Sequence, residues 1–359
     1  MTEVFNIAIV GAGIGENQAS GLLNLQDRFR ISVICDKNIA RAEGLADMIV
    51  RAGAPRPAIA GEFGPTLLAR GDIDIVSICL PPFLHFDAVR QALEAGKHVV
   101  CEKPLVGSLA QVDALDALAL NHGKTLMPVF QYRFGNGMLK AKHLLESGAA
   151  GKVYLASLET HWTRKADYYD VAWRGKMATE LGGVFLGHAI HIHDMLTHLV
   201  GEVRSVSALT RVRVNPIETE DCAGALFDMA DGSIAVSSAS LGSADEISRL
   251  RLMCENVTMI SNLSPYAPHC DPWTFLPKSP RDDTFLGDAL ASAPSASEGY
   301  AEQFARYHQA LVSGSALPIT VADARRSIAL ASAIYHSART GEQVTLPLPK
   351  GHPTWNGWN

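Results

Sequence analysis

The chain has 359 residues, a formal net charge of −6 and 47% hydrophobic residues. This length predicts two domains, and a charged content of only 19% argues against intrinsic disorder. An acidic chain without a long basic run is not expected to bind nucleic acid, and no apolar run approaches the ~18–20 residues that span a bilayer. Six scattered cysteines without a C-x-x-C pattern, and an N-terminus that passes directly into an apolar run, favour reduced thiols and a cytoplasmic location.

The first part of the chain alternates short apolar runs with stretches of helical periodicity. We expect strands at 4–10, 31–35, 73–80 and 97–104, and helices at 17–29, 38–52 and 84–95. Strands that alternate with helices indicate βαβ units and a parallel sheet.

From about residue 152 onward the predicted strands are longer and partly alternate apolar with polar residues. They lie at 153–162, 203–212, 222–229, 233–241 and 250–260. Asp231-Gly232 predicts a hairpin turn between two of them, and a helix near 185–199 interrupts the series. The pattern predicts a largely antiparallel sheet with one face covered.

The last hundred residues begin with a stretch rich in proline, serine and aspartate, 261–299. A connection of this length is a lid, an interface segment or a disordered region. Two amphipathic helices are expected after it, at 300–313 and 321–340.

The turn after the first predicted strand has the composition of a pyrophosphate site. Gly11, Gly13 and Gly15 would let a ligand approach the backbone at the start of a helix, whose N-terminal N–H groups favour a phosphate. Glu16 stands where the G-x-G-x-x-G pattern has its third glycine, and glycines in such a turn can also be purely steric. Asp36 ends the second predicted strand, where a carboxylate binds the ribose hydroxyls of a dinucleotide. Together these features predict a nicotinamide dinucleotide.

Asp36 also bears on the choice of cofactor. A carboxylate at this position repels a 2′-phosphate, so NAD is favoured over NADP. Lys37 follows directly and leaves NADP possible.

Several motifs point to one family. They are Pro81-Pro82-x-x-His85, Ala95-Gly96-Lys97-His98-Val99, Glu102-Lys103-Pro104, and the segments 130–134, 182–196 and 333–348. With them the chain closely resembles, over nearly its whole length, the glucose–fructose oxidoreductase/inositol dehydrogenase family (Gfo/Idh/MocA). The resemblance implies an α/β N-terminal Rossmann domain, 1–124, and an α+β C-terminal domain, 125–359, with a large, mostly antiparallel open sheet and a C-terminal helix able to pack back on the first domain. It also implies NAD(P)-dependent oxidoreduction at a secondary alcohol or ketone of a sugar, cyclitol or sugar derivative.

The resemblance assigns roles to individual residues. Lys103 would be the catalytic lysine beside the nicotinamide, and Glu102 would lie near the ribose of that ring. Lys103 follows a predicted parallel strand, where ligands bind in open α/β sheets, and its ammonium can hydrogen-bond the oxygen that changes charge during hydride transfer. The residues expected to bind the cofactor are Gly11, Gly13, Ile14, Gly15, Asp36, Lys37, Leu80, Pro81, His85, Glu102, Lys103 and Gln131.

A histidine-rich segment carries the second part of the family pattern. His191 matches the family histidine and Asp194 matches the aspartate three residues further, but Gly187 replaces the first aspartate. On one helix His188 and His191 would share a face, while His193 points elsewhere. His191 suits acid–base catalysis because an unperturbed imidazole has a pKa of ~6.5, and His188 can stand in for the missing carboxylate.

The residues expected to contact a sugar or polyol are Arg133, Trp162, Trp173, Arg174, His188 and His191. Two other functions stay open. The first is a sensor that binds NAD(H) or a sugar without turnover, motivated by Gly187 and Glu16. The second is a metal-dependent hydrolase built on His188, His191 and His193, although the leading interpretation needs no metal. Family precedent and an exposed sheet favour a homodimer or homotetramer.

Overall fold

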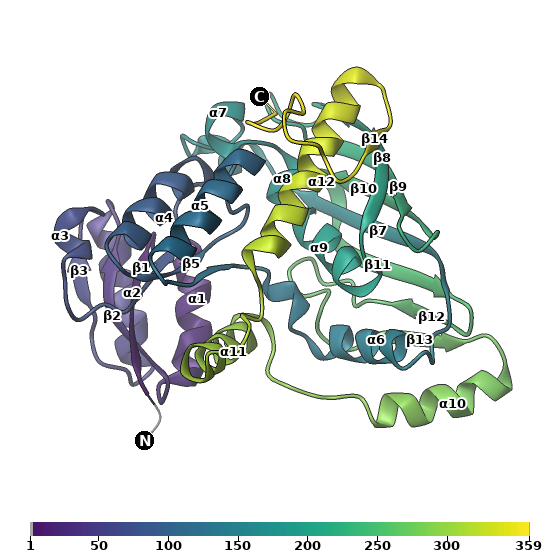
Figure 1. Cartoon of the computed structure of the whole chain (residues 1–359), viewed down its shortest axis with the longest axis horizontal. Helices are drawn as coiled ribbons and strands as arrows, with labels where there is room; N and C mark the ends of the chain where they lie inside the picture. Colours follow the sequence, from purple (N-terminus) through teal and green to yellow (C-terminus); the bar gives the residue numbers. More distant parts are fainter. Residues whose placement is uncertain (1–2, 359) are drawn as a thin grey trace. The chain divides into compact units, whose positions relative to one another are not determined.

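The computed structural model describes residues 3–358. The chain divides into two compact units. The first consists of the chain up to Gln131 together with Gly299–Arg325, and the second of Tyr132–Glu298 together with the chain from Arg326 onward. A C-terminal segment therefore belongs to the first unit, and the division falls inside the last long helix, α12 (Val321–Thr340). Figure 1 shows the chain coloured along its sequence.

The first unit contains a six-stranded parallel sheet. Its strands are β1 (Phe5–Val10), β2 (Phe29–Cys35), β3 (Ala58–Ala60), β4 (Ile75–Ile78), β5 (His98–Cys101) and β6 (Leu126–Pro128). They lie in the order β3-β2-β1-β4-β5-β6, and every neighbouring pair is parallel. β4 is buried along its whole length because helices cover both faces of the sheet. The order reverses between β1 and β4, and such a switch point is where open α/β sheets bind ligands.

Helices connect these strands. They are α1 (Gly15–Leu22), α2 (Ile39–Arg51), α3 (Pro65–Leu68), α4 (His85–Glu94) and α5 (Leu109–Asn121), with short 3₁₀ turns η1 (Leu23–Leu25) and η2 (Pro82–Leu84). The side chains of Asn38 and Ser108 cap the N-termini of α2 and α5. The returning helix α11 (Gly299–Ser313) packs against α1 so closely that a Cβ at Gly21 would lie 2.7 Å from the Cβ of Tyr300.

The second unit contains an eight-stranded open sheet. Its strands are β7 (Val153–Thr163), β8 (Val203–Arg211), β9 (Cys222–Met229), β10 (Ile234–Ser240), β11 (Gly242–Cys254), β12 (Val257–Ile260), β13 (Thr274–Pro277) and β14 (Val344–Thr345). They lie in the order β13-β12-β11-β7-β10-β9-β8-β14. Only β7 and β10 pair in parallel; the other pairs are antiparallel. The predicted fold class, a Rossmann unit followed by a mostly antiparallel open sheet, is confirmed.

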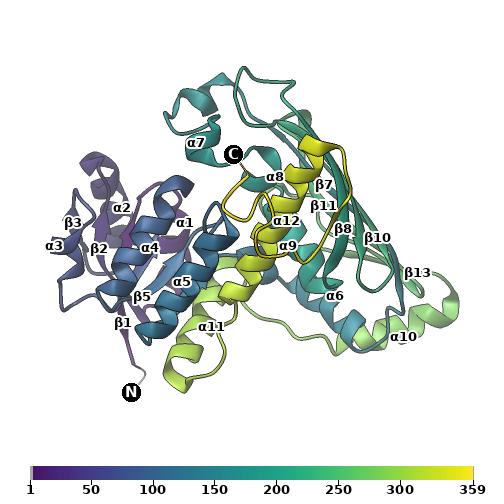
Figure 2. The ribbon, with the colours of Figure 1, turned by 45° about the horizontal axis from the view of Figure 1, so that its top comes forward.

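Helices cover one face of this sheet (Figure 2). The helices of the second unit are α6 (Asn136–Glu146), α7 (Met177–Glu180), α8 (Val184–Gly187), α9 (Ile190–Leu199), α10 (Pro280–Ala291) and most of α12, with 3₁₀ turns η3 (Gln131–Arg133), shared with the first unit, and η4 (Ala166–Asp170). Along β10 buried residues alternate with exposed or half-exposed ones, as a one-sided sheet requires. The other face carries exposed apolar side chains, among them Leu226, Ile234 and Val236.

Three expectations need correction. The predicted helix 185–199 is two helices, because the backbone breaks at His188, which has φ −123° and ψ −57°. The predicted strand 250–260 is the hairpin β11–β12, which turns at residues 255–256, where the Asn256 side chain donates to the carbonyl of Ala149. The stretch 261–299 contains β13 and α10, so it is built into the second unit and is not a structureless loop.

Two other sequence expectations concern the whole chain. Within residues 3–358, every helix is too short or too polar to cross a bilayer. All six cysteines are free thiols, as their spacing predicts.

Candidate functional site

The glycine-rich turn lies at the carboxyl end of β1, beside the switch point. Gly11 has φ +101°, and a Cβ there would lie 2.3 Å from the carbonyl oxygen of Cys79 after β4. A Cβ at Gly15 would lie 2.6 Å from Cγ2 of Ile9, so this glycine lets α1 pack on β1. A Cβ at Gly13, by contrast, would meet no described atom within 4 Å, and this side of the turn is open. Glu16 is exposed and tolerated, since Gly15 already provides the close helix–strand contact.

Asp36 is tied to the same turn. It follows β2 directly, and its carboxylate accepts hydrogen bonds from the N–H groups of Ala12 (2.8 Å) and Asn38 (2.8 Å). The carboxylate is therefore fixed beside the glycine-rich turn, with lone pairs left for further donors. Lys37 and Ile14 are both exposed.

Glu102 and Lys103 follow β5 at the same edge of the sheet. Glu102 is buried, and its Oε1 accepts hydrogen bonds from Nε2 of Gln18 and Oη of Tyr300, both at 2.8 Å. Its Oε2 accepts from the backbone N–H of Lys103 at 3.3 Å. The Ser77 hydroxyl donates in turn to Oε1 of Gln18. This network holds an acidic side chain rigidly at the base of the half-buried Lys103.

His85 connects two of these loops. Its ring is buried, with Nε2 2.7 Å from the carbonyl oxygen of Leu80 and Nδ1 2.8 Å from that of Pro104. Burial lowers the pKa of His85, which keeps the ring neutral, so it donates to one of the two oxygens at a time. Both ring nitrogens face the protein backbone, and the histidine spans the loops that follow β4 and β5. Pro81 is half-buried and directly precedes the η2 turn, which leads from Leu80 toward His85.

The same edge fits a dinucleotide. The open side of Gly13 at the N-terminus of α1 suits a pyrophosphate, and the Asp36 carboxylate suits ribose hydroxyls. Gln131 follows β6, and its Oε1 is buried without a hydrogen-bond partner among the described residues. An amide donor of a bound nicotinamide would satisfy this acceptor.

The second unit holds His191 in a stack of rings. The ring centre of Tyr132 lies 4.3 Å from that of His191, at an interplanar angle of 23°, and 4.7 Å from that of His269, at 19°. All three side chains are buried. His269 is clamped by the start of α6, where a Cβ at Gly135 would lie 2.2 Å from the His269 carbonyl oxygen. Burial lowers the pKa of His269 to about 4, so its ring is neutral near neutral pH.

Arg133 and Asp194 form a buried ion pair. Nε and Nη2 of Arg133 lie 2.8 and 2.6 Å from the two carboxylate oxygens of Asp194, and the side chains are 5% and 2% exposed. Such a two-pronged pair fixes α9 against η3, and breaking it by removing one partner costs about 3–5 kcal/mol. The predicted contact of Arg133 with substrate stays a prediction.

Four of the other residues predicted to contact substrate lie together with three further residues. We call Trp162, Arg164, Tyr168, Trp173, Arg174, His188 and Tyr266 the aromatic–arginine cluster. Within it the Arg174 guanidinium lies 3.7 Å from the ring centre of Tyr168, and that of Arg164 lies 5.0 Å from it. Oη of Tyr168 is 3.4 Å from Nε2 of His188. The cluster therefore includes His188, which lies at the break between α8 and α9, next to Gly187.

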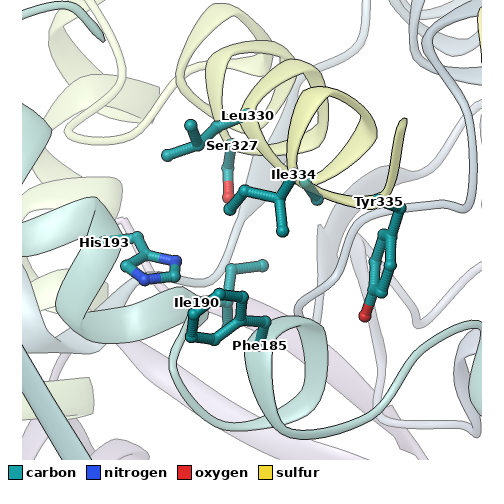
Figure 3. Close-up of a pocket in the computed structure, with 8 residues that line it drawn as sticks. Phe185, Ile190, His193, Ser327, Leu330, Ile334 and Tyr335 are labelled. Carbon is teal, nitrogen blue, oxygen red and sulfur yellow. The ribbon is translucent and has the colours of Figure 1, made fainter. Parts of the chain in front are cut away.

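His193 belongs to a different environment. It lines an apolar pocket between α8, α9 and α12 with Phe185, Ile190 and Ile334 (Figure 3). Nε2 of His193 is 2.8 Å from the Ser237 hydroxyl, and burial lowers its pKa to about 3, so it is a neutral core residue. Among residues 3–358 no three His, Cys, Asp or Glu side chains are arranged to hold a metal ion, and the hydrolase interpretation is unsupported.

Sequence reasoning missed the residues that hold the others. Gln18 and Tyr300 lie 84 and 198 positions from the Glu102 that they bind, and Tyr132 and His269 are far apart in sequence as well. No local pattern marks them, although a buried carboxylate at a ligand-binding edge implies that some donor must satisfy it.

An open parallel sheet of this order, with a glycine-rich turn after its first strand and a carboxylate after its second, defines a dinucleotide-binding α/β protein. Two family models match the chain. One, described as an oxidoreductase family with an NAD-binding Rossmann fold, covers residues 5–130, and the other, described as the GFO/IDH/MocA C-terminal domain, covers residues 138–260. The chain belongs to the Gfo/Idh/MocA oxidoreductase family, and its first unit is an NAD-binding Rossmann domain.

Known proteins agree with this assignment. The uncharacterized oxidoreductase YrbE of Bacillus subtilis is 30% identical over 244 residues, 66% of this chain and 67% of the relative. Levoglucosan dehydrogenase of Pseudarthrobacter phenanthrenivorans is 31% identical over 140 residues, 38% of this chain and 36% of that enzyme. This chain matches several curated relatives, levoglucosan dehydrogenase among them, over less than half of their length. The WlbA dehydrogenase of Bordetella pertussis, solved with NADH and UDP-GlcNAcA, aligns with a TM-score of 0.82 at 27% identity, over 97% of this chain and 100% of that chain.

Proposed function

We propose that this protein is an NAD-dependent dehydrogenase or reductase acting on a secondary alcohol or ketone of a sugar or polyol. The observation that carries the proposal is the arrangement after β5, where the buried Glu102 is held by Gln18 and Tyr300 and the half-buried Lys103 follows it. Relatives named for levoglucosan and for a complex with UDP-GlcNAcA support a sugar-like substrate.

The proposed roles in the first unit follow from its geometry. Bound NAD would accept or supply the hydride. The turn at Gly11, Gly13 and Gly15 would hold its pyrophosphate and Asp36 its adenosine ribose, with Ile14 and Lys37 at the rim. The loops at Leu80, Pro81, Glu102 and Gln131 would surround its nicotinamide half. The Lys103 ammonium would donate a hydrogen bond to the substrate oxygen as its charge changes. His85, whose nitrogens face two backbone carbonyls, would position Lys103 and not touch the cofactor.

His191 is proposed to accept the proton of the substrate hydroxyl during oxidation and to return it during reduction. Its stack on Tyr132 limits rotation of the ring, so the imidazole is oriented without the carboxylate that the family pattern has at position 187. The aromatic–arginine cluster, together with His188, would bind the rest of the substrate. The Arg133–Asp194 pair would hold α9, and with it His191, in place.

The proposal also covers assembly and location. The exposed apolar side chains on the uncovered face of the second sheet, such as Leu226 and Val236, favour a homodimer or homotetramer through that face. Analytical ultracentrifugation of Val236→Arg beside the native protein tests this. A cytoplasmic location stays a prediction.

The decisive test is a screen for NADH formation with sugars, sugar acids and cyclitols, using both NAD and NADP. Turnover that requires Lys103 and His191 supports the proposal. NADH binding without turnover on any compound, in either direction, would favour the non-catalytic sensor.

A further inference from the structure

One side chain of the aromatic–arginine cluster carries a charge that the protein does not neutralise. Arg174 is half-buried, and among the described residues no carboxylate lies within 4.0 Å of its guanidinium. Nη1 donates to the carbonyl oxygen of Tyr168 at 3.3 Å, which uses one of the five N–H donors of the group. Arg164 differs, because its Nη1 pairs with Glu246 at 3.1 Å and its Nη2 donates to Oη of Tyr266 at 2.7 Å.

The Arg174 side chain is also held in a fixed orientation. Its guanidinium carbon lies 3.7 Å from the ring centre of Tyr168 and 5.2 Å from that of Trp173. Stacking on aromatic faces leaves the edge of a guanidinium available for a planar, two-pronged contact. A preorganised arginine of this kind is suited to bind a carboxylate.

The neighbouring position has lost a negative charge. Oη of Tyr168 contacts His188, and the adjacent Gly187 stands where the family pattern has an aspartate. A Cβ at Gly187 would meet no described atom within 4 Å, so there is room for a larger group. The buried carboxylate of Glu180 accepts hydrogen bonds from the N–H of Gly175 and the Thr219 hydroxyl.

We infer that the substrate is a sugar derivative that carries a carboxylate, a uronic or aldonic acid, and that Arg174 binds this group. The inference rests on the proposed function and adds the substrate class. A carboxylate is favoured over a phosphate because one unpaired guanidinium matches a single charge, whereas a phosphate dianion needs a second unpaired cation, and the Arg164 charge is already paired.

The test compares sugars that share one ring. D-glucose, D-glucuronate and D-glucose 6-phosphate, with D-galactose and D-galacturonate as a second series, are titrated calorimetrically into the NADH-loaded protein, in which an alcohol cannot be oxidised. We expect the uronates to bind more tightly than the neutral sugars and the phosphate, with an affinity that falls as salt rises. Arg174→Gln should weaken uronate binding about 10- to 100-fold, the range for losing a hydrogen bond to a charged group, and leave neutral sugars unchanged.

Three variants sharpen the comparison. Arg174→Lys keeps the charge but loses the planar fork, so its uronate affinity should fall between those of the native protein and Arg174→Gln. Gly187→Asp should weaken uronate binding more than neutral-sugar binding. Arg251→Gln removes one exposed arginine from β11 and serves as the control for net charge. Thermal unfolding of each variant checks that it is folded.

The outcomes separate this inference from the proposed function. The inference is overturned if the uronate does not bind or binds no more tightly than the neutral sugar. It is also overturned if Arg174→Gln leaves the affinity for the uronate unchanged. Tighter binding of D-glucose 6-phosphate overturns it as well. If uronates bind through Arg174 but yield no NADH when NAD is supplied, the substrate class stands and the proposed activity fails. If only neutral polyols yield NADH, the activity stands and the inference fails.

Discussion

Glu220 gives the second unit a stability that depends on pH. Its carboxylate is buried and accepts three hydrogen bonds: from the N–H of Gly183 (2.8 Å), the N–H of Phe185 (3.0 Å) and Oη of Tyr335 (2.9 Å). These bonds favour the ionised form and lower the pKa of Glu220, but burial is the larger effect and raises it from 4.5 to about 7. The group lies at the N-terminus of α8, the short helix that ends at Gly187.

The direction of the effect follows from proton linkage. Because the folded protein holds this proton more tightly than the unfolded chain does, its contribution to stability is complete below pH 4.5 and disappears as the pH rises through about 7. A shift of this size corresponds to a loss of about 2.5 kcal/mol in unfolding free energy between pH 5 and pH 8. For a unit of some two hundred residues, that is about 5–10 °C in Tm.

The assay compares the native protein with Glu220→Gln by thermal unfolding from pH 5 to pH 8. The amide cannot satisfy all three donors, so the variant should be less stable at pH 5 by about 1–3 kcal/mol. It has no proton to lose in this range, and its deficit should shrink by about 5–10 °C in Tm as the pH rises. Other titrating groups are common to both proteins and cancel in the difference. Parallel pH profiles, or a deficit that grows with pH, would refute the reasoning.

Three further changes test the proposed site. Asp36→Ala should narrow the preference for NAD over NADP, measured as the ratio of kcat/KM values; a native protein that already prefers NADP would contradict the role of this carboxylate. Lys103→Ala should leave NADH binding, followed by fluorescence, largely intact but lower kcat by a factor on the order of 10², and Lys103→Arg should be poor as well; near-normal turnover would remove Lys103 from the mechanism. Tyr132→Leu removes the stack on His191, so kcat should fall while KM changes little and the pH profile of kcat shifts; a fall in Tm with an unchanged profile would mean that Tyr132 serves packing alone.

The sequence was most informative where chemistry depends on local spacing. The glycine-rich turn and Asp36 belong to one continuous strand–turn–helix–strand segment of the sequence, so local spacing predicts both. In the structure both lie at one edge of the parallel sheet. The strands β7 and β9 carry enough alternating residues to be recognised at nearly their observed bounds. β3 and β6, with three residues each, are too short to show any period.

Tertiary contacts explain what the sequence did not predict. The helical pattern across 185–199 is continuous in the sequence, yet the backbone breaks at His188. The start of α8 is bound by the carboxylate of Glu220, which is 35 positions from Phe185 in the sequence, so a local hydrophobic pattern does not reveal this contact. No local pattern shows that Arg133 pairs with Asp194, because the two residues are 61 positions apart in the sequence. The composition of 261–299 predicted a lid, an interface segment or a disordered region. In the structure part of this stretch packs onto α6, because Gly135 and Gly137 leave space for His269 and Trp273.

Gly187 stands in the proposed site at the position where the resembled family pattern has an aspartate. In the family pattern that aspartate accompanies the histidine, and a carboxylate beside an imidazole both orients the ring and favours its charged form. Here Tyr132 stacks on His191, and His269, held by α6, stacks on Tyr132, so ring packing limits rotation of the imidazole. In the proposed site this packing would hold the histidine without a carboxylate at position 187. Under the proposed function, the absence of a negative charge at position 187, next to the His188 that contacts Tyr168, would favour the negatively charged substrate inferred above.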